Sequence, residues 1–239
     1  GDGTLYFYDK SDKRPTALSV KSTFMGDVDS AIQNIHANSF DSTPFAIAHR
    51  FYESTFPQNT IIAASMCLSA GFDMLEVDAQ PSADGTLYLF HDVAVNGLTD
   101  GTGQFNQLTD AYIDTLRFTD LAGTPYADEP IPTLASFLEF IKENHVQSYI
   151  EIKNKNSDND VINFVNQIID AGAEDQVIFN SGYVQDCAIA RNITKRMRVS
   201  IYASSTIQDA THKIPIMATM QPSELWIDKG FTTDRTLLD

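Results

Sequence analysis

The sequence has little positive charge, almost no cysteine and no long apolar run. Its 239 residues carry 16 Lys and Arg against 32 Asp and Glu, so the formal net charge at pH 7 is −16. Binding to nucleic acid or to an anionic membrane needs basic side chains that displace the ions held by phosphate groups. The charge therefore predicts no nucleic-acid partner and no broad phosphate-binding surface, while a small anionic site inside a cleft stays open.

Membrane and export signals are also missing. The longest apolar stretches, such as residues 60–70, are shorter than the roughly 18 residues that a membrane-spanning helix requires. The chain begins Gly1-Asp2-Gly3 with no basic and then apolar segment, so we expect neither a signal peptide nor stable membrane insertion. The acidity favours an extracellular or periplasmic location, and a phage-tail protein would be virion-associated.

The two cysteines, Cys67 and Cys187, have no CxxC spacing and no histidine at metal-finger distance. Their arrangement excludes a disulfide scaffold and a structural zinc site. Each lies in a predicted helix among apolar residues, which indicates a buried free thiol.

From about residue 45 the chain alternates short apolar segments with segments of helical periodicity. Such alternation predicts crossover units and a parallel sheet covered by helices. Strands are expected at 45–48, 74–78, 148–152, 177–180, 199–203 and 225–227. Helices are expected at 59–70, 134–144, 160–171 and 184–192.

One segment interrupts this order. Ala83-Asp84-Gly85 is a turn signal between the second strand and the apolar run 86–90, which predicts an inserted β-hairpin. Six parallel strands in an α/β chain indicate a TIM (β/α) barrel. That fold has eight strands, so the last two are expected to be absent from the chain unless another segment closes the sheet. Residues 1–44 lack the alternation and are predicted to form an N-terminal extension, with the barrel domain at 45–239.

Acidic residues stand where two of these strands end. Residues two apart in a strand point to the same side, so Glu76 and Asp78 are expected to face one way, with apolar residues facing the other. Glu151 and Lys153 repeat the spacing on the next parallel strand. Buried anions need a compensating cation, and three carboxylates suit a hard divalent ion, Ca²⁺ or Mg²⁺. Solvated strand faces are the alternative interpretation.

Two histidines lie at the ends of elements beside these carboxylates. His49 closes the first strand and His91 closes the hairpin. Imidazole titrates near neutral pH, so the pair supplies the acid and the base that cleavage of a phosphoester requires. Arg50 has a planar guanidinium that fits phosphate oxygens, and the ammonium of Lys153 favours an anionic substrate. Either histidine alone is better explained as an ordinary hydrogen-bonding side chain.

Seven short motifs in residues 45–228 resemble the glycerophosphodiester phosphodiesterase family in order and approximate spacing. They are Ala48-His49-Arg50, Pro57-Gln58-Asn59-Thr60, Glu76-Val77-Asp78, Asp84-Gly85, His91-Asp92, Pro132-Thr133-Leu134 and Glu151-Ile152-Lys153. The resemblance implies a TIM-barrel phosphodiesterase of the phosphatidylinositol phospholipase C-like superfamily. It implies that His49 and His91 are the general acid and base, that Glu76, Asp78 and Glu151 bind one divalent cation, and that Arg50 and Lys153 contact the substrate phosphate.

Two positions depart from the family's pattern. Phe51 stands where the family usually has glycine, and we expect it to reshape the mouth of the site. Gln58 stands where the family often has glutamate, which removes one negative charge.

The leading functional prediction is metal-dependent hydrolysis of a glycerophosphodiester to glycerol phosphate and an alcohol. The substrate is either a small diester or a glycerol-phosphate-containing surface polymer such as teichoic acid, and the nucleophile is water or a neighbouring substrate hydroxyl. One alternative is a non-catalytic or weakly catalytic receptor- or polymer-binding module of a fibre or phage-tail protein, which would be oligomeric. Another is a phospholipase D-like lipid phosphodiesterase.

Overall fold

The computed structural model of the chain describes residues 2–9, 14–21, 47–51, 56–203 and 223–227, with five further positions between 212 and 220. The chain divides into two compact units, Ile47–Ile178 and the combination of Gly1–Ala46 with Phe179–Asp239. Most of the predicted N-terminal extension lies outside the described residues, and the predicted boundary at residue 44 stays a prediction.

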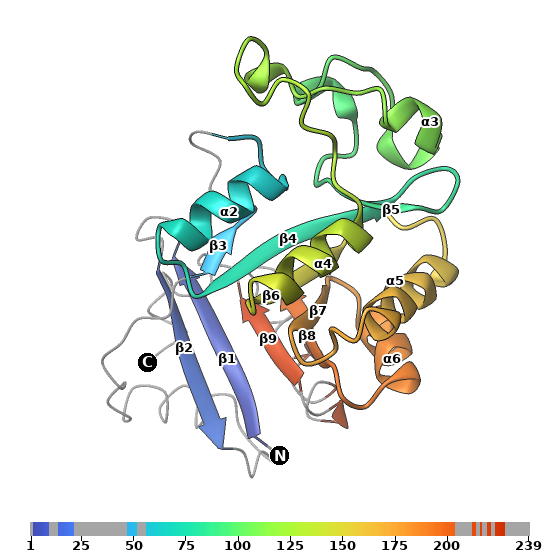
Figure 1. Ribbon diagram of the computed structural model, residues 1–239. Coiled ribbons are helices and arrows are strands. Elements are labelled where there is room, and N and C mark those ends of the chain that lie inside the picture. The colour runs from blue at the N-terminus through green and yellow to red at the C-terminus, as the bar shows by residue number, and fades with distance from the viewer. Residues whose placement is uncertain are drawn as a thin grey trace. The chain divides into compact units, whose positions relative to one another are not determined.

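The unit Ile47–Ile178 is an α/β sheet of parallel strands with one hairpin (Figure 1). β4 (Met74–Pro81) pairs in parallel with β3 (Ile47–His49) on one side and β6 (Gln147–Ile152) on the other. β5 (Leu87–Leu89) runs antiparallel to β4. The strands predicted at 74–78 and 148–152, their parallel order and the inserted hairpin are thereby confirmed. The strand predicted at 45–48 is found as β3, while residues 45 and 46 lie outside the described residues.

Helices α2 (Ile61–Ser69), α4 (Leu134–Glu143) and α5 (Asp158–Asp170) follow β3, β5 and β6 in this unit. Threonine begins two of them, because the hydroxyls of Thr60 and Thr133 accept hydrogen bonds from the N–H groups of Ala63 and Ser136. In α5, apolar residues at three- and four-residue spacing share one face and are buried. These residues are Val161, Phe164, Val165 and Ile168.

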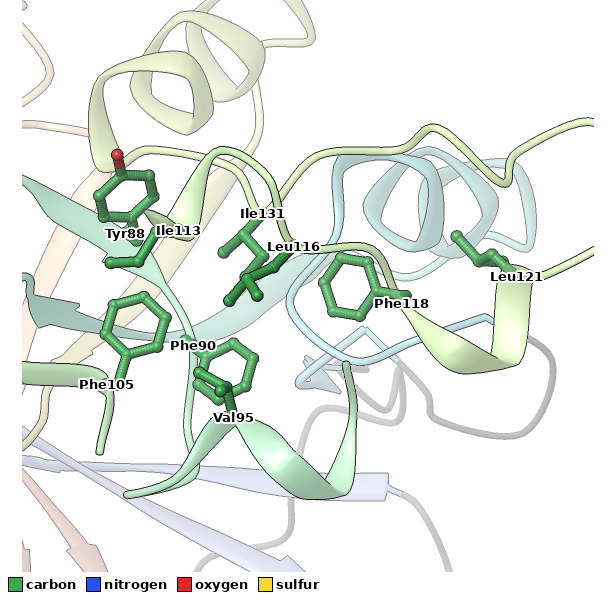
Figure 2. Packing of buried hydrophobic residues seen from close by; sticks show 9 residues of the cluster. All are labelled: Tyr88, Phe90, Val95, Phe105, Ile113, Leu116, Phe118, Leu121 and Ile131. Carbon is green, nitrogen blue, oxygen red and sulfur yellow. The ribbon is translucent and has the colours of Figure 1, made fainter. Parts of the chain in front are cut away.

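Between the hairpin and α4 lies a long segment that holds only short helices. They are η1 (Val95–Gly97), η2 (Phe105–Gln107), α3 (Asp110–Ile113) and η3 (Thr119–Leu121). This segment packs on the hairpin through an apolar cluster, which Figure 2 shows. The apolar cluster comprises Tyr88, Phe90, Val95, Phe105, Ile113, Leu116, Phe118, Leu121 and Ile131. The segment has little regular secondary structure, so its stability comes mainly from the burial of these nine apolar side chains. Hydrophobic stabilisation scales with the apolar area removed from water.

In the second unit, β8 (Arg198–Ala203) and β9 (Ser223–Ile227) pair in parallel, and α6 (Val184–Ile193) precedes them. β7 (Val177–Ser181) spans the boundary between the units. β1 (Asp2–Asp9) pairs in parallel with β9 and antiparallel with β2 (Arg14–Lys21). The sheet therefore continues past the last predicted strand with a segment from the N-terminal extension.

The expectation of buried free thiols is met. Cys67 and Cys187 are buried free thiols, and burial raises the pKa of the Cys67 thiol to about 11. None of the helices described combines the length and the apolar character needed to cross a membrane.

Candidate active site

Strand register gathers the predicted site residues at one edge of the sheet in the unit Ile47–Ile178. β3 and β4 pair so that His49 lies opposite Glu76, and β4 and β6 pair so that Asp78 lies opposite Glu151. Parallel strands end on the same side, so these residues converge at the carboxyl ends, where barrel enzymes place their reactive groups. We call the seven predicted residues the active-site cluster: His49, Arg50, Glu76, Asp78, His91, Glu151 and Lys153.

Three carboxylates form the centre of the active-site cluster. One ligand oxygen each of Glu76, Asp78 and Glu151 lies within 4.8 Å of the others. Glu76 and Asp78 are 3% and 1% exposed, so the alternative of a solvated strand face is wrong for both. Burial, followed by repulsion from Asp78 and Glu151, raises the pKa of Glu76 well above its ordinary value. Burial also raises the pKa of Glu151, against the opposing effect of Lys153.

This donor set fits a divalent cation. Three carboxylate oxygens are hard ligands, which Ca²⁺ and Mg²⁺ prefer. The pKa of Glu76 is raised because negative charge is buried there without compensation. A bound cation would supply that compensation.

Two basic side chains lie beside the carboxylates. The guanidinium Nε of Arg50 is 3.3 Å from Asp78 Oδ2. The Nζ of Lys153 is 2.8 Å from Glu151 Oε1 and 3.7 Å from Asp78 Oδ1. Burial alone lowers the pKa of Lys153, but Glu151 and Asp78 outweigh it and raise the pKa, so the ammonium stays charged. Both basic side chains are partly exposed, which leaves them accessible to an anionic substrate.

A left-handed turn directs Arg50 toward the carboxylates. Arg50 and Phe51 have φ angles of 49° and 63°, a region that costs energy for residues other than glycine. The N–H of Arg50 donates to Glu76 Oε2 at 3.0 Å and to the Glu76 carbonyl at 2.9 Å, which holds the turn against β4. The Phe51 ring is buried and packs on Phe137, with ring centroids 5.5 Å apart. The expectation that Phe51 reshapes the mouth is therefore wrong, because its side chain fills the core.

The two histidines have different surroundings. His49 Nε2 lies 3.8 Å from Glu76 Oε2. His91 has Arg50 Nη2 at 2.7 Å from its Nε2 and Asp92 Oδ1 at 2.8 Å from its Nδ1. A guanidinium only donates, so His91 Nε2 is the acceptor and Nδ1 carries the proton that it donates to Asp92. His91 is thus a neutral imidazole whose lone pair, on Nε2, faces Arg50.

Three amide side chains support the active-site cluster and escaped the sequence analysis as functional residues. Asn59 Nδ2 donates to Asp78 Oδ2 at 3.4 Å, and the N–H of Asp78 donates to Asn59 Oδ1 at 3.2 Å. Gln58 Oε1 accepts from Arg50 Nη1 at 3.2 Å. Gln58 and Asn59 both belong to the motif Pro57-Gln58-Asn59-Thr60, which is the sequence feature that could have identified them as functional. The third amide, Gln80, stands outside the motifs.

A model of the glycerophosphoryl diester phosphodiesterase family matches residues 49–225, a range that contains the whole active-site cluster. The chain belongs to this family. Membership confirms the resemblance that the seven motifs carry.

Two relatives of this family each align with a little under half of this chain. The glycerophosphodiester phosphodiesterase of Caldanaerobacter subterraneus subsp. tengcongensis is 36% identical over 107 residues, which are 45% of this chain and 44% of that protein. Human glycerophosphodiester phosphodiesterase 1 is 31% identical over 110 residues, 45% of this chain and 33% of that protein. The chain thus spans less than half the length of these curated relatives.

Solved structures support the fold. A phosphodiesterase from Oleispira antarctica, solved in complex with the product sn-glycerol-3-phosphate, superposes with a TM-score of 0.68 at 22% identity. The superposition covers 77% of this chain and 75% of that one. At this identity the likeness shows the fold alone, and the predicted α/β TIM-barrel class is confirmed.

Proposed function

We propose that the chain hydrolyses a glycerophosphodiester, in a metal-dependent reaction, to glycerol phosphate and an alcohol. The observation that carries the proposal is the convergence of three carboxylates, two basic side chains and two imidazoles at the ends of neighbouring strands. Family membership supports the reaction class. The substrate is a small glycerophosphodiester or a glycerol-phosphate-containing surface polymer, and the latter would place the protein outside the cell or on a virion.

The substrate phosphate carries one negative charge and would be held by Arg50 and Lys153. Arg50 offers a planar fork of N–H donors, and Lys153 a point charge. A divalent cation bound by Glu76, Asp78 and Glu151 would neutralise charge on a phosphoryl oxygen and lower the barrier to attack. The basic side chains already lie against these carboxylates, so the phosphate would enter a site whose charges are in place.

The two imidazoles have complementary roles in the proposal. The lone pair on His91 Nε2 accepts a hydrogen bond from Arg50; once Arg50 turns to the substrate phosphate, Nε2 accepts the proton of the attacking hydroxyl, from water or from the substrate, while Asp92 holds its Nδ1–H. His49 is the second imidazole of the site, with its Nε2 3.8 Å from Glu76 Oε2, and is assigned the role of the acid. His49 then donates its proton to the leaving alcohol.

The test is release of glycerol 3-phosphate from glycerophosphocholine and from a glycerol-phosphate polymer, each with Ca²⁺, with Mg²⁺ and with EDTA. Turnover that needs a metal and disappears in Glu76→Ala would support the hydrolase and identify the preferred substrate. A folded chain that binds the polymer equally well in the wild type and in Glu76→Ala, without turnover of either substrate, would replace the proposal with a binding module.

A further inference from the structure

Gln80 contacts the backbone on both sides of His91. It lies on β4 at the position two residues beyond Asp78, and none of its surface is exposed. Its Nε2 donates to the carbonyl of Phe90 and to the carbonyl of Asp92, each at 2.9 Å. The chain leaves the β4–β5 ladder at this point, so the two carbonyls depend on a side chain for their hydrogen bonds.

The chemistry of the contact fixes the orientation of the amide. A carboxamide nitrogen has two hydrogens, and the two carbonyls use both. The reversed orientation would set Oε1 against two carbonyl oxygens. In the observed orientation, Oε1 accepts a hydrogen bond from Asn154 Nδ2 at 3.0 Å.

Asn154 connects this contact to the strand that carries Glu151 and Lys153. It follows Lys153 directly and has a φ of 42°, in the left-handed region that asparagine tolerates better than most residues. Its carbonyl accepts from Asn106 Nδ2 at 3.2 Å. The hydrogen bonds therefore join β4, the residues after β6 and the His91 segment into one arrangement.

We infer that Gln80 is a positioning residue that holds His91 in place relative to the carboxylates. The inference rests on the proposed function in that it assigns His91 to the reaction. The imidazole is joined to Arg50 and Asp92 at its ring, but its direction depends on the backbone of residues 90–92. Because Gln80 shares β4 with Glu76 and Asp78, it fixes that backbone to the strand that carries two of the carboxylates.

The test compares Gln80→Met with Gln176→Met in the full chain. Methionine has nearly the volume of glutamine but neither of its hydrogen-bonding groups. Gln176 is a matched control, because its Nε2 also donates to two carbonyls, those of Ile141 and Val146, and neither bond involves the active-site cluster. Asn154→Gly is a milder second variant, which removes one bond to Gln80 and keeps a residue that accepts positive φ.

The readouts are kcat and KM for glycerophosphocholine, thermal unfolding, and the imidazole tautomers from long-range proton–nitrogen correlation spectra. The His91 signal is assigned by its loss in His91→Gln. Gln80→Met should lower kcat by about 10- to 100-fold with little change in KM, because a misplaced catalytic group costs rate more than binding. It should also replace the single Nδ1–H tautomer of His91 with a mixture. Asn154→Gly should show the same changes to a smaller extent.

Gln176→Met should lower the unfolding temperature but leave kcat and the His91 signal unchanged. The inference is overturned if Gln80→Met keeps the wild-type His91 tautomer, or if both methionine variants change kcat equally. If the wild type shows no turnover of either diester with Ca²⁺ or Mg²⁺, the proposed function fails. The tautomer spectra then still decide whether Gln80 positions His91.

Discussion

Phe90 and His91 are consecutive, yet they belong to regions that burial affects in opposite ways. Burial stabilises the apolar cluster, which contains Phe90, and disfavours the charged groups of the active-site cluster, which contains His91. Phe90 is part of the apolar cluster and stacks on Phe105 with ring centroids 4.8 Å apart. His91 belongs to the active-site cluster, where buried Glu76 has a raised pKa. A buried anion costs free energy unless a cation compensates it, whereas buried apolar area lowers the free energy of the folded state.

Stability and chemistry are separable here, although Phe90 and His91 are joined by a peptide bond. The apolar cluster should determine how stable the unit Ile47–Ile178 is, because its nine buried side chains carry no charge to compensate. The active-site cluster should determine turnover while it contributes little to stability, or reduces it. Variants in the two clusters should therefore change different measurements.

Glu76→Gln should have the largest effect on turnover without a loss of stability. The substitution removes a proposed metal ligand, so we expect kcat to fall about 1000-fold or more, which is about 4 kcal/mol of barrier. Stability without metal should be unchanged or higher, because a buried anion is replaced by a neutral group of the same shape. Steady-state kinetics and urea unfolding in EDTA measure the two effects. A variant that keeps its activity but unfolds more readily would reverse the roles of the two clusters.

The opposite pattern is expected for Phe118→Ala in the apolar cluster. Removing a buried phenylalanine ring should lower the free energy of unfolding by about 3–5 kcal/mol, since a cavity adds to the lost burial. The kcat of the molecules that remain folded should stay within a few-fold of the wild type, because Phe118 belongs to the apolar cluster and not to the active-site cluster. Phe118→Leu, which leaves a smaller cavity, should lose less stability. A large fall in kcat in both variants, with stability unchanged, would contradict the comparison.

The raised pKa of Glu76 and of Glu151 predicts how pH and metal act together. Without metal, the folded chain binds more protons than the unfolded chain between the unfolded pKa of about 4.3 and the raised folded values. Stability from these groups is therefore present below the unfolded pKa and is lost as pH rises through the folded pKa. The loss is about 1.4 kcal/mol for each pH unit that separates the two pKa values. A bound cation requires the deprotonated carboxylates, so its stabilising effect should grow over the same range.

The measurement is the unfolding temperature with Ca²⁺, with Mg²⁺ and with EDTA at a series of pH values from acid to neutral. The difference between metal and EDTA should widen as pH rises. The Glu76→Gln, Glu151→Gln double variant is the control and should show a smaller difference at every pH. An increase in the wild type that does not change with pH would show that the metal binds elsewhere.

Much of the fold and of the active-site cluster could be predicted, because both follow from local spacing. Residues two apart in a strand share a face, and parallel register then brings Glu76, Asp78 and Glu151 together. The parts that escaped prediction depend on contacts between distant segments. Asn59 belongs to one of the seven motifs but its role depends on its hydrogen bond with Asp78 in the folded chain. Gln80 stands outside the motifs and gains its role from its hydrogen bonds with Phe90 and Asp92.

Two larger features could not be predicted from the sequence either. The apolar cluster comes from a segment with one-turn helices, where too few residues repeat for a helical period to appear. The pairing of β1 with β9 joins residues from the two ends of the chain, and local pattern carries no information on such pairing.

Phe51 is expected to give the smallest effect, and it tests how apolar packing supports the active-site cluster. It follows Arg50 of the active-site cluster, yet its ring is buried against Phe137. Phe51→Ala and Phe51→Gly both lose that ring, but only glycine escapes the cost of a Cβ at a φ of 63°. We expect the glycine variant to be more stable than the alanine variant by about 1 kcal/mol.

At Phe137, inside α4, the order should reverse, with alanine more stable than glycine by about 1 kcal/mol, because the helix interior favours alanine. Urea unfolding of the four variants measures both differences. If alanine is the better replacement at both positions, the left-handed turn at Phe51 carries no strain, and the glycine that is usual there in the family needs another explanation. If the orders are opposite, the buried ring stabilises a turn that the active-site cluster requires, and the backbone that presents Arg50 depends on apolar packing behind it.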